Sequence, residues 1–456
     1  MTHPGLGHAR DTTLRAGRAP GARPLTGHLT RLYRAPLPFL TDLPRHGDLV
    51  EIRIGRRPFL VLCHPDLARA VLTDDRTYDR VGPSYEGSRR AMGNGLATCP
   101  YADHRAQRRM LRPAFRPDHL ERYAAVMGRT IEETTDGWHD GLEVDLAEEL
   151  FALATKTAVR ALFASDLTPA AAQELHRALA TFLKGVYRQS LMPWAGRLPT
   201  PGNLRYGRAL KQWHAEAGRL IAAHRSGASS DSRNVLSHLV AARTADGTPL
   251  PDPDIHDQAT ALVLAGSETT AAALAWSCHL LARHPGAGRR LREEARTVLG
   301  GRVATLEDVP RLTVTSRVLT EALRLYPPAW LVPRTTTCET SLAGRRLPVG
   351  STVVFSPYVL HRRADLYPEP HRFLPDRWST GPGGGGPAGA RHRTYMPFGL
   401  GAHRCIGESF ALTEATMALA TLVARWEMRP VPGTVVRPAV RAVLAPERLP
   451  VRLVTP

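Results

Sequence analysis

Aromatic residues are scarce in this chain: phenylalanine, tryptophan and tyrosine together make up 6% of its 456 residues. The formal net charge is +18, but no run of lysine or arginine exceeds two residues, and aromatic side chains do not alternate with basic ones. A surface that stacks and neutralises nucleic acid needs both features. We therefore expect no nucleic-acid partner and interpret the charge as a solvated, arginine-rich surface with one functional patch.

Cysteine is also rare, with five residues in an irregular, odd-numbered set: Cys63, Cys99, Cys278, Cys338 and Cys405. This pattern argues against a disulfide framework and against a zinc site, and it fits a reducing cytoplasm. Residues 1–20 contain arginines but no apolar core, so they are neither a signal peptide nor a membrane anchor. We expect a basic, partly disordered tail there.

No internal repeat and no Pro/Ser-rich linker divides the remaining chain, although its length alone would allow about three domains. Two short apolar strands, 49–54 and 58–63, are predicted to form a hairpin, and most of the chain after residue 65 has helical periodicity. The longest predicted helix, 254–283, carries Glu268 at mid-span, which argues against a transmembrane segment. We predict one mainly α-helical domain, 21–456, with a small β region.

The most informative segment ends in a cysteine: Phe398-Gly-Leu-Gly-Ala-His-Arg-Cys-Ile-Gly407. Cys405 comes just before an alanine- and leucine-rich stretch, 408–426, that is predicted to be helical. Backbone N–H groups at a helix start favour a thiolate, and the glycines allow a tight turn and close approach to a flat ligand. A thiolate on a rigid loop is one of the few ways in which proteins ligate haem iron.

The spacing Phe-x-x-Gly-x-His-x-Cys-x-Gly resembles the haem loop of the cytochrome P450 family. The resemblance implies the P450 fold, with haem b buried between the longest helix and the helix after the cysteine loop. It implies a haem-thiolate monooxygenase in which Cys405 binds iron and Phe398 and Gly407 contact the haem. His403 stands where the family usually carries arginine, and a histidine can still donate to a haem propionate.

A second motif, Ala265-Gly-Ser-Glu-Thr-Thr270, lies in the longest predicted helix and resembles the family's oxygen-activation motif. Gly266 leaves room for O₂, and the Thr269 hydroxyl can replace a backbone bond and hold water or oxygen in place. Glu268 can relay protons from solvent. The resemblance implies that these three residues are catalytic, with glutamate in place of the commoner aspartate.

Two further sets of residues match the family. Glu321 and Arg324 lie one turn apart before Tyr-Pro-Pro, and Arg377 follows in Phe373-Leu-Pro-Asp-Arg-Trp378, which resembles the family's buried Glu-Arg-Arg network. That network is structural, because buried bidentate pairs fix geometry. Three basic residues suit the haem propionates: His104, Arg108 and Arg334.

The substrate pocket is expected to be lined by the loop 81–98, residues 182–187, the central helix near 263–264, and residues 329–332. Because these segments are mostly apolar, the substrate is expected to be a small hydrophobic molecule. Residues 185–188, 197–201 and 326–330 are similar to P450s that oxidise cyclic terpenes, of the pentalenene and epi-isozizaene oxygenase kind. A sesquiterpene of bacterial secondary metabolism is the favoured substrate, and a polyketide, macrolide or fatty acid is the alternative. The candidate pocket residues are Tyr85, Met92, Tyr187, Val263, Leu264, Ala329, Trp330 and Val332.

Electrons are expected to come from separate proteins, which in bacterial relatives are a ferredoxin and a ferredoxin reductase. An acidic ferredoxin would dock by electrostatic steering on the basic surface behind Cys405. Two other classes stay open: a haem-thiolate enzyme that uses peroxide or isomerises its substrate, and a non-catalytic haem-binding sensor. The Glu268–Thr269 pair argues against the first, because such enzymes commonly lack it. The basic residues are Arg108, Arg109, Arg112, Arg391, Arg393 and Arg404.

Overall fold

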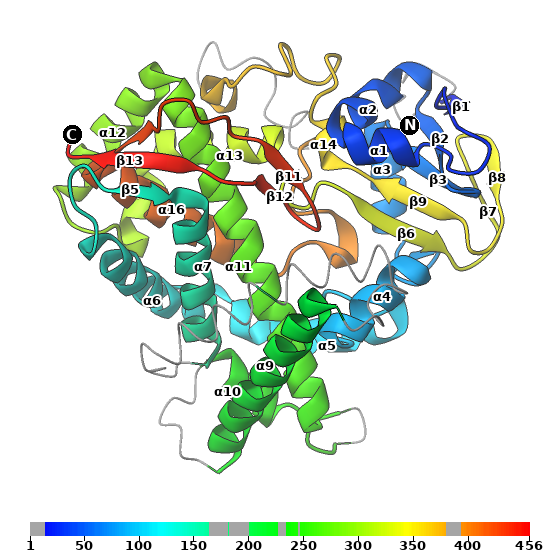
Figure 1. The fold of residues 1–456 in the computed structure, drawn as a ribbon. Helices are drawn as coiled ribbons and strands as arrows, with labels where there is room; N and C mark the ends of the chain where they lie inside the picture. The colour runs from blue at the N-terminus through cyan, green and yellow to red at the C-terminus, as the bar shows by residue number, and fades with distance from the viewer. Residues whose placement is uncertain (1–13, 164–180, 182–199, 227–233, 245–246, 380–393) are drawn as a thin grey trace, which may run out of the picture.

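The computed structural model describes residues 14–163, 181, 200–226, 234–244, 247–379 and 394–456, and most of them are helical (Figure 1). The α-helices are α1 (Leu29–Arg34), α2 (Pro36–Asp42), α3 (Pro65–Thr73), α4 (Pro83–Met92), α5 (Tyr101–Leu111), α6 (Pro117–Asp136), α7 (Leu146–Phe163), α9 (Pro201–Arg225), α10 (Val235–Ala241), α11 (Asp252–Arg283), α12 (Pro285–Leu299), α13 (Thr313–Leu325), α14 (Pro357–Leu360) and α16 (Glu408–Arg425). Short 3₁₀ helices are η1 (Leu43–His46), η2 (Arg112–Phe115), η4 (Leu306–Arg311), η5 (Pro375–Trp378) and η6 (Gly401–His403).

The largest sheet has six strands in the order β1-β2-β3-β9-β6-β4 and lies on the opposite side of the molecule from α6, α7 and α12 (Figure 1). The strands of this sheet are β1 (Ala16–Arg18), β2 (Leu49–Ile54), β3 (Arg57–Leu62), β4 (Tyr78–Asp79), β6 (Val332–Thr336) and β9 (Thr352–Phe355). A three-stranded sheet has the order β10-β13-β5, and β7–β8 and β11–β12 are antiparallel pairs. Their bounds are β5 (Glu143–Asp145), β7 (Thr340–Leu342), β8 (Arg345–Leu347), β10 (Glu427–Pro430), β11 (Pro438–Val440), β12 (Leu444–Pro446) and β13 (Pro450–Val454).

The central element is α11, a 32-residue helix that crosses the molecule between the sheet side and the helical side (Figure 1). Asp252 and Asp254 lie in its first turn, where carboxylates are favoured by the helix dipole, and Pro285 already belongs to the next helix. Its residues are buried on most faces because α7, α9, α13 and α16 all pack against it. The predicted helix 254–283 is therefore confirmed, with the start two residues earlier.

The predicted hairpin is also confirmed, as β2 and β3 pair antiparallel from Leu49↔Leu62 to Ile54↔Arg57. Within the segment 1–20, which was expected to be a partly disordered tail, Ala16–Arg18 forms β1 and pairs parallel with β2. The glycine-rich segment 381–389 lies outside the described residues. None of the helices in the described ranges combines the length and the apolar character needed to cross a bilayer.

Candidate active site

Cys405 is held by a short turn between two regular elements, η6 and α16. Its backbone N–H donates to the carbonyl of Phe398 (2.9 Å), and the N–H of Gly407 faces the sulfur. Gly401 has a positive φ of 70°, and a Cβ atom there would lie 2.4 Å from the carbonyl oxygen of Leu72 on α3. The glycine is required at this position because the loop presses directly against α3. Gly407 has an ordinary φ of −92°, so it caps α16 without needing glycine's conformational freedom.

Burial raises the pKa of the Cys405 thiol, while the Gly407 N–H and the guanidinium groups of Arg108 and Arg404 lower it. The net direction is upward, so the helix start alone does not produce a thiolate, contrary to the simplest expectation from the sequence. A metal ion bound to the sulfur would deprotonate it outright. The other four cysteines are all free thiols and do not line the cavity described next.

A cavity of about 380 Å³ lies between the cysteine loop and the middle of α11. Cys405 and Phe398 line one wall, and Ala265, Gly266 and Thr269 line another. Other apolar walls come from α13, from Ala329 and Val332, and from Leu412 and Ala415 on α16. The cavity thus brings together the cysteine loop and the segment 265–270 of α11. We call this segment the acid–alcohol turn, after Glu268 and Thr269.

The acid–alcohol turn is built as one continuous stretch of α11. The hydroxyl of Thr269 donates to the carbonyl oxygen of Ala265 (2.6 Å), one turn back along the helix. Glu268 does not belong to the cavity wall, and its charged neighbour is Arg441. Burial raises the pKa of Glu268 to about 7, against a smaller lowering by Arg441. A carboxyl with this pKa can both accept and release a proton at neutral pH.

Gly266 and Ala158 of α7 both line the cavity and face one another across it. A Cβ atom on Gly266 would lie 3.5 Å from the Cβ of Ala158, an ordinary van der Waals distance. Protein packing therefore does not require glycine at this position. That Gly266 makes room for O₂ stays a prediction.

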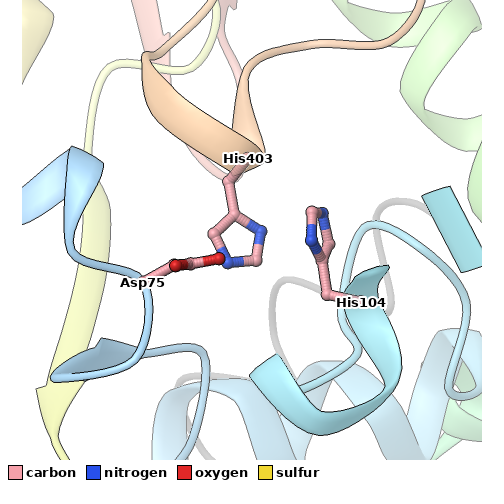
Figure 2. A group of neighbouring side chains, drawn as sticks. All are labelled: Asp75, His104 and His403. Carbon is pink, nitrogen blue, oxygen red and sulfur yellow. The ribbon is translucent and has the colours of Figure 1, made fainter. Parts of the chain in front are cut away.

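The polar end of the cavity gathers two histidines from separate segments, His104 on α5 and His403 on η6, with Asp75 beside them (Figure 2). The ring centroids of the histidines lie 3.8 Å apart, and one ligand atom from each of the three residues falls within 4.8 Å of the others. Oδ2 of Asp75, Nδ1 of His104 and both ring nitrogens of His403 are buried without a hydrogen-bond partner. Orphaned buried polar atoms that converge in this way indicate a polar group that completes the site.

The surrounding charges decide what that group is. Burial lowers the pKa of His104 to about 3 and lowers that of His403 further, and Arg80, Arg108 and Arg334 lower both. A divalent metal ion would be repelled by these three guanidinium groups. A pair of carboxylates would be attracted by them and would accept a hydrogen bond from the one N–H that each neutral imidazole carries. The cluster is therefore suited to an anion, although its ligand atoms alone resemble a metal site.

Comparisons with known proteins agree with this geometry. The family model for "Cytochrome P450" matches residues 18–451. This chain is a cytochrome P450. It is 46% identical to cyclooctatin synthase of Streptomyces melanosporofaciens over 426 residues, which are 92% of this chain and 91% of that protein. It is 44% identical to pentalenene oxygenase of Streptomyces avermitilis over 443 residues, 97% and 98% of the two chains.

A solved structure described as the "cytochrome P450DA heme domain" superimposes with a TM-score of 0.84 at 26% identity, covering 97% of this P450 and 98% of that chain. The predicted P450 fold is thereby confirmed. Enzymes of this family are monooxygenases whose cofactor is haem b, bound through a cysteine thiolate. This P450 is therefore a haem monooxygenase, and its cavity fits the cofactor: a sulfur on one wall, apolar walls around it, and an anion-binding end for the two propionates.

The basic residues predicted for the propionates do lie at that end of the cavity. His104, Arg108, Arg334 and His403 all line it. The side chain of Arg334 is held by the hydroxyl of Tyr85 (3.0 Å), and that of Arg108 donates to the carbonyl of Arg404 (2.6 Å).

Several predicted pocket residues lie elsewhere. On α11 the cavity-lining positions follow a helical repeat that includes 262, 265, 266, 269 and 273. Val263 and Leu264 do not line this cavity and are buried in the core, so their role as walls of the substrate pocket stays a prediction. Ala329 and Val332 do line the cavity.

The bulky residues predicted to shape the pocket have structural partners instead. Trp330 packs in the core beside the sheet, with its N–H on the carbonyl of Arg441 (2.8 Å). Met92 packs against the helical core, and the hydroxyl oxygen of Tyr85 accepts a hydrogen bond from Arg334. None of the three is among the described residues that line this cavity, and their role in shaping the substrate pocket stays a prediction. Tyr187 and the segment 182–187 lie outside the described residues.

The Glu-Arg-Arg network is assembled as the motif implies. Glu321 and Arg324 are fully buried, and Arg377 donates its Nε–H to Glu321 (3.0 Å). The indole N–H of Trp378 (2.9 Å) and the backbone N–H of Leu374 (3.0 Å) complete the carboxylate's shell. These contacts fasten η5 to α13 beside the core.

Two residues of the polar end were missed from the sequence, Arg80 and Asp75. Arg80 lines the cavity and donates to the carbonyls of Leu96 (2.9 Å) and Ala97 (3.2 Å), while burial lowers its pKa to about 10. Both residues flank the short strand β4, in a segment without a helical or strand pattern long enough to orient a side chain. The only signal in the sequence was that the charged residues Asp75 and Arg80 had no assigned role in a stretch whose pattern indicates a turn.

Proposed function

We propose that this P450 hydroxylates or otherwise oxidises a cyclic terpene, with Cys405 as the thiolate ligand of the haem iron and a ferredoxin as electron donor. One observation carries the proposal: a single cavity has the Cys405 sulfur on one wall and the Ala265–Thr269 turn on another. No other cysteine lines that cavity among the described residues. The five thiols are free, which suits a reducing cytoplasm.

Haem, once bound, supplies the activation of O₂, and the chain supplies position and protons. Cys405 donates its thiolate from a loop fixed by Gly401 and by the Phe398 carbonyl. The Thr269 hydroxyl stands at the cavity surface, where it can hold water or the incoming oxygen. Glu268 lies behind it toward Arg441 and carries a proton between solvent and the Thr269 hydroxyl, a role to which its pKa of about 7 is matched.

The substrate class rests on the cavity walls and on the relatives. Apart from its basic end, the cavity is walled largely by apolar side chains such as Leu262, Ala329 and Val332, which recognise shape and exclude hydroxyl-rich molecules. The names of the relatives, pentalenene oxygenase and cyclooctatin synthase, support a terpene substrate. A hydrocarbon ring system fits such walls without leaving buried polar groups unpaired.

The ferredoxin site is proposed on the surface behind Cys405. Arg109, Arg112 and Arg404 are exposed there, and Arg404 is partly neutralised by Glu408 (2.6 Å). Arg391 and Arg393 lie outside the described residues. An acidic ferredoxin should reduce the enzyme more slowly as salt rises, and a rate independent of ionic strength would rule out electrostatic docking.

The proposal is tested by reconstitution with a ferredoxin, its reductase and NADPH, using a panel of cyclic terpenes and macrolides. A hydroxylated terpene, formed with consumption of O₂ and lost in Cys405→Ser, is the expected result. A hydroxylated macrolide or fatty acid instead would keep the monooxygenase and replace the substrate. Product formed only with added peroxide would indicate the peroxide-driven class, and haem binding with no ferredoxin-supported consumption of NADPH would indicate a sensor.

A further inference from the structure

The N-terminal part of the described chain carries a large share of the exposed apolar surface. Of the six large hydrophobic side chains that are exposed in the described residues, three belong to one short segment: Leu25, Leu29 and Tyr33. Leu25 is 72% exposed and Tyr33 is 90% exposed. Single exposed apolar side chains are ordinary, but a group of them indicates a surface that meets a partner.

Two of these side chains stand on the outer face of α1. Leu29 and Tyr33 are one turn apart on this helix, so they project from the same side. Leu32 lies between them in sequence and packs inward, against the core cluster that contains Trp330. Helix α1 lies beside α2 and the strands β2 and β3, at the sheet side of the molecule (Figure 1).

The loop that carries Leu25 is fixed to the β2–β3 hairpin. Gly27 forms a β-bridge with Ile54 and has a positive φ of 58°, and a Cβ atom on Gly27 would overlap the carbonyl of Arg53. The ring of the buried His28 accepts the N–H of Arg53 at Nδ1 (2.9 Å) and donates from Nε2 to the carbonyl of Ala19 (3.2 Å). The exposed side chains therefore stand on a backbone that is already ordered.

Arginines surround this apolar group, and acidic residues are missing from it. Residues 14–41 contain five arginines and no aspartate or glutamate, and the hairpin turn 53–57 adds three more exposed arginines. We call these two segments together the N-terminal corner. The nearest acid in the hairpin, Glu51, is buried and already paired with Arg18, Arg53 and Arg345. Within the described part of the chain, the corner arginines without a carboxylate in ion-pair range are Arg23, Arg31, Arg34, Arg56 and Arg57.

The charge and shape of the N-terminal corner decide which class of partner fits it. A second copy of the chain would bring two acid-free arginine surfaces together, and they would repel one another. A bilayer with anionic lipids attracts arginines to its phosphates and takes up leucine and tyrosine side chains at the depth of the headgroups. It also needs no matching pocket for a side chain that protrudes as far as Tyr33, whereas a folded protein does.

We propose that the N-terminal corner binds the surface of membranes that contain anionic lipids. Leu25, Leu29 and Tyr33 enter the headgroup region, and the unpaired arginines contact lipid phosphates. The binding is peripheral and reversible, because a six-residue helix with three apolar contacts buries too little surface for a permanent anchor. A cyclic terpene dissolves in lipid better than in water, so the bound enzyme meets its substrate at a higher concentration. Only this last consequence rests on the proposed function.

Co-sedimentation of the haem-loaded enzyme with vesicles tests the proposal. Vesicles of equal parts phosphatidylglycerol and phosphatidylcholine should bind the wild type, and vesicles of phosphatidylcholine alone should bind it much more weakly. Leu29→Ser combined with Tyr33→Ser should weaken binding to the anionic vesicles about tenfold or more. Val435→Ser, which changes an equally exposed apolar residue between β10 and β11, should not weaken it. A wild type that does not bind the anionic vesicles would overturn the proposal and leave an acidic protein as the expected partner.

The arginines are tested with a control of equal net charge. Arg56→Gln combined with Arg57→Gln should weaken binding to the anionic vesicles about tenfold or more. Arg129→Gln combined with Arg289→Gln removes two exposed arginines from α6 and α12, on the opposite side of the molecule, and should leave binding unchanged (Figure 1). Equal losses in the two double variants would overturn the assignment of the corner, by showing that net charge alone attracts the enzyme. Binding is measured without substrate or electron donor, so a failure of the proposed function does not change the result.

Discussion

Glu321 and Arg324 are joined by two hydrogen bonds of 2.8 Å across one turn of α13, and both side chains have no exposed surface. The remaining donors of Arg324 reach the carbonyls of His361, Pro370 and Arg372. The pair therefore ties α13 to the segment between α14 and η5, on the path toward the cysteine loop. Its charges compensate one another in a place that water does not reach.

Glu321→Gln is predicted to destabilise the protein by about 3–5 kcal/mol, because Arg324 and Arg377 lose the charge that balances them. The matched control is Glu339→Gln, which breaks a similar two-bond pair with Arg346 at the surface. That change should cost under about 1 kcal/mol. Urea unfolding measures the loss of unfolding free energy in each of the two variants. Equal losses would show that the buried network does not stabilise this region.

Leu262 and Leu264 are two residues apart on α11 and should behave differently. Leu262 lines the cavity and Leu264 packs in the core. Leu264→Ala should destabilise the protein by about 2–5 kcal/mol and leave substrate affinity unchanged. Leu262→Ala should change the affinity or the position of hydroxylation. Substrate titrations and product analysis check this, and a changed product from Leu264→Ala would refute the assigned helix face.

Glu268→Gln is predicted to slow product formation about 100-fold or more, the contribution typical of a positioned acid or base. Because the carboxyl is protonated below its pKa of about 7, the wild-type yield of product per NADPH should fall as the pH rises through that value. The variant should have no such step. Ser267→Ala is the control, since its hydroxyl is buried on the carbonyl of Val263 (2.7 Å), away from the cavity. A wild-type profile that is flat between pH 6 and pH 8 would remove Glu268 from the relay.

The buried acid Glu414 should make stability fall with rising pH. Its pKa is raised from 4.5 to about 8 on folding, so between these values the folded state binds the proton and the unfolded state does not. Each pH unit in this window costs about 1.4 kcal/mol, and the full stability is present only below the unfolded pKa. Glu414→Gln should lower that slope between pH 5.5 and pH 7.5. Unfolding free energies measured at several pH values would contradict this if both proteins had the same slope.

The sequence motifs predicted the parts of the site whose geometry is local. Cys405 with its glycines, the Ala265–Thr270 turn and the Glu321–Arg324 spacing each lie within one turn or loop, where residue spacing determines geometry. The hairpin 49–63 and the central helix were predictable for the same reason, from two short apolar runs joined by a turn and from one long helical run.

The remaining parts depend on packing between distant segments. Val263 and Leu264 were placed in the pocket because α11 is apolar on nearly every face, so its hydrophobic pattern could not indicate which face meets the cavity. Asp75 and Arg80 come to the polar end from a stretch between α3 and α4 that has no strong periodicity. Glu414 meets Thr157 and Thr270 only because three helices converge. No spacing rule links residues separated by more than a hundred positions.

The most direct test is a titration of the purified ferric protein with cyclic sesquiterpenes while the Soret band is recorded. The account predicts a haem spectrum in the wild type and a saturable low-spin to high-spin shift with at least one terpene, as a substrate in the cavity displaces water from the iron. A shift with a macrolide but with no terpene would contradict the proposed terpene substrate. A protein without a Soret band after loading with haem would contradict the account as a whole.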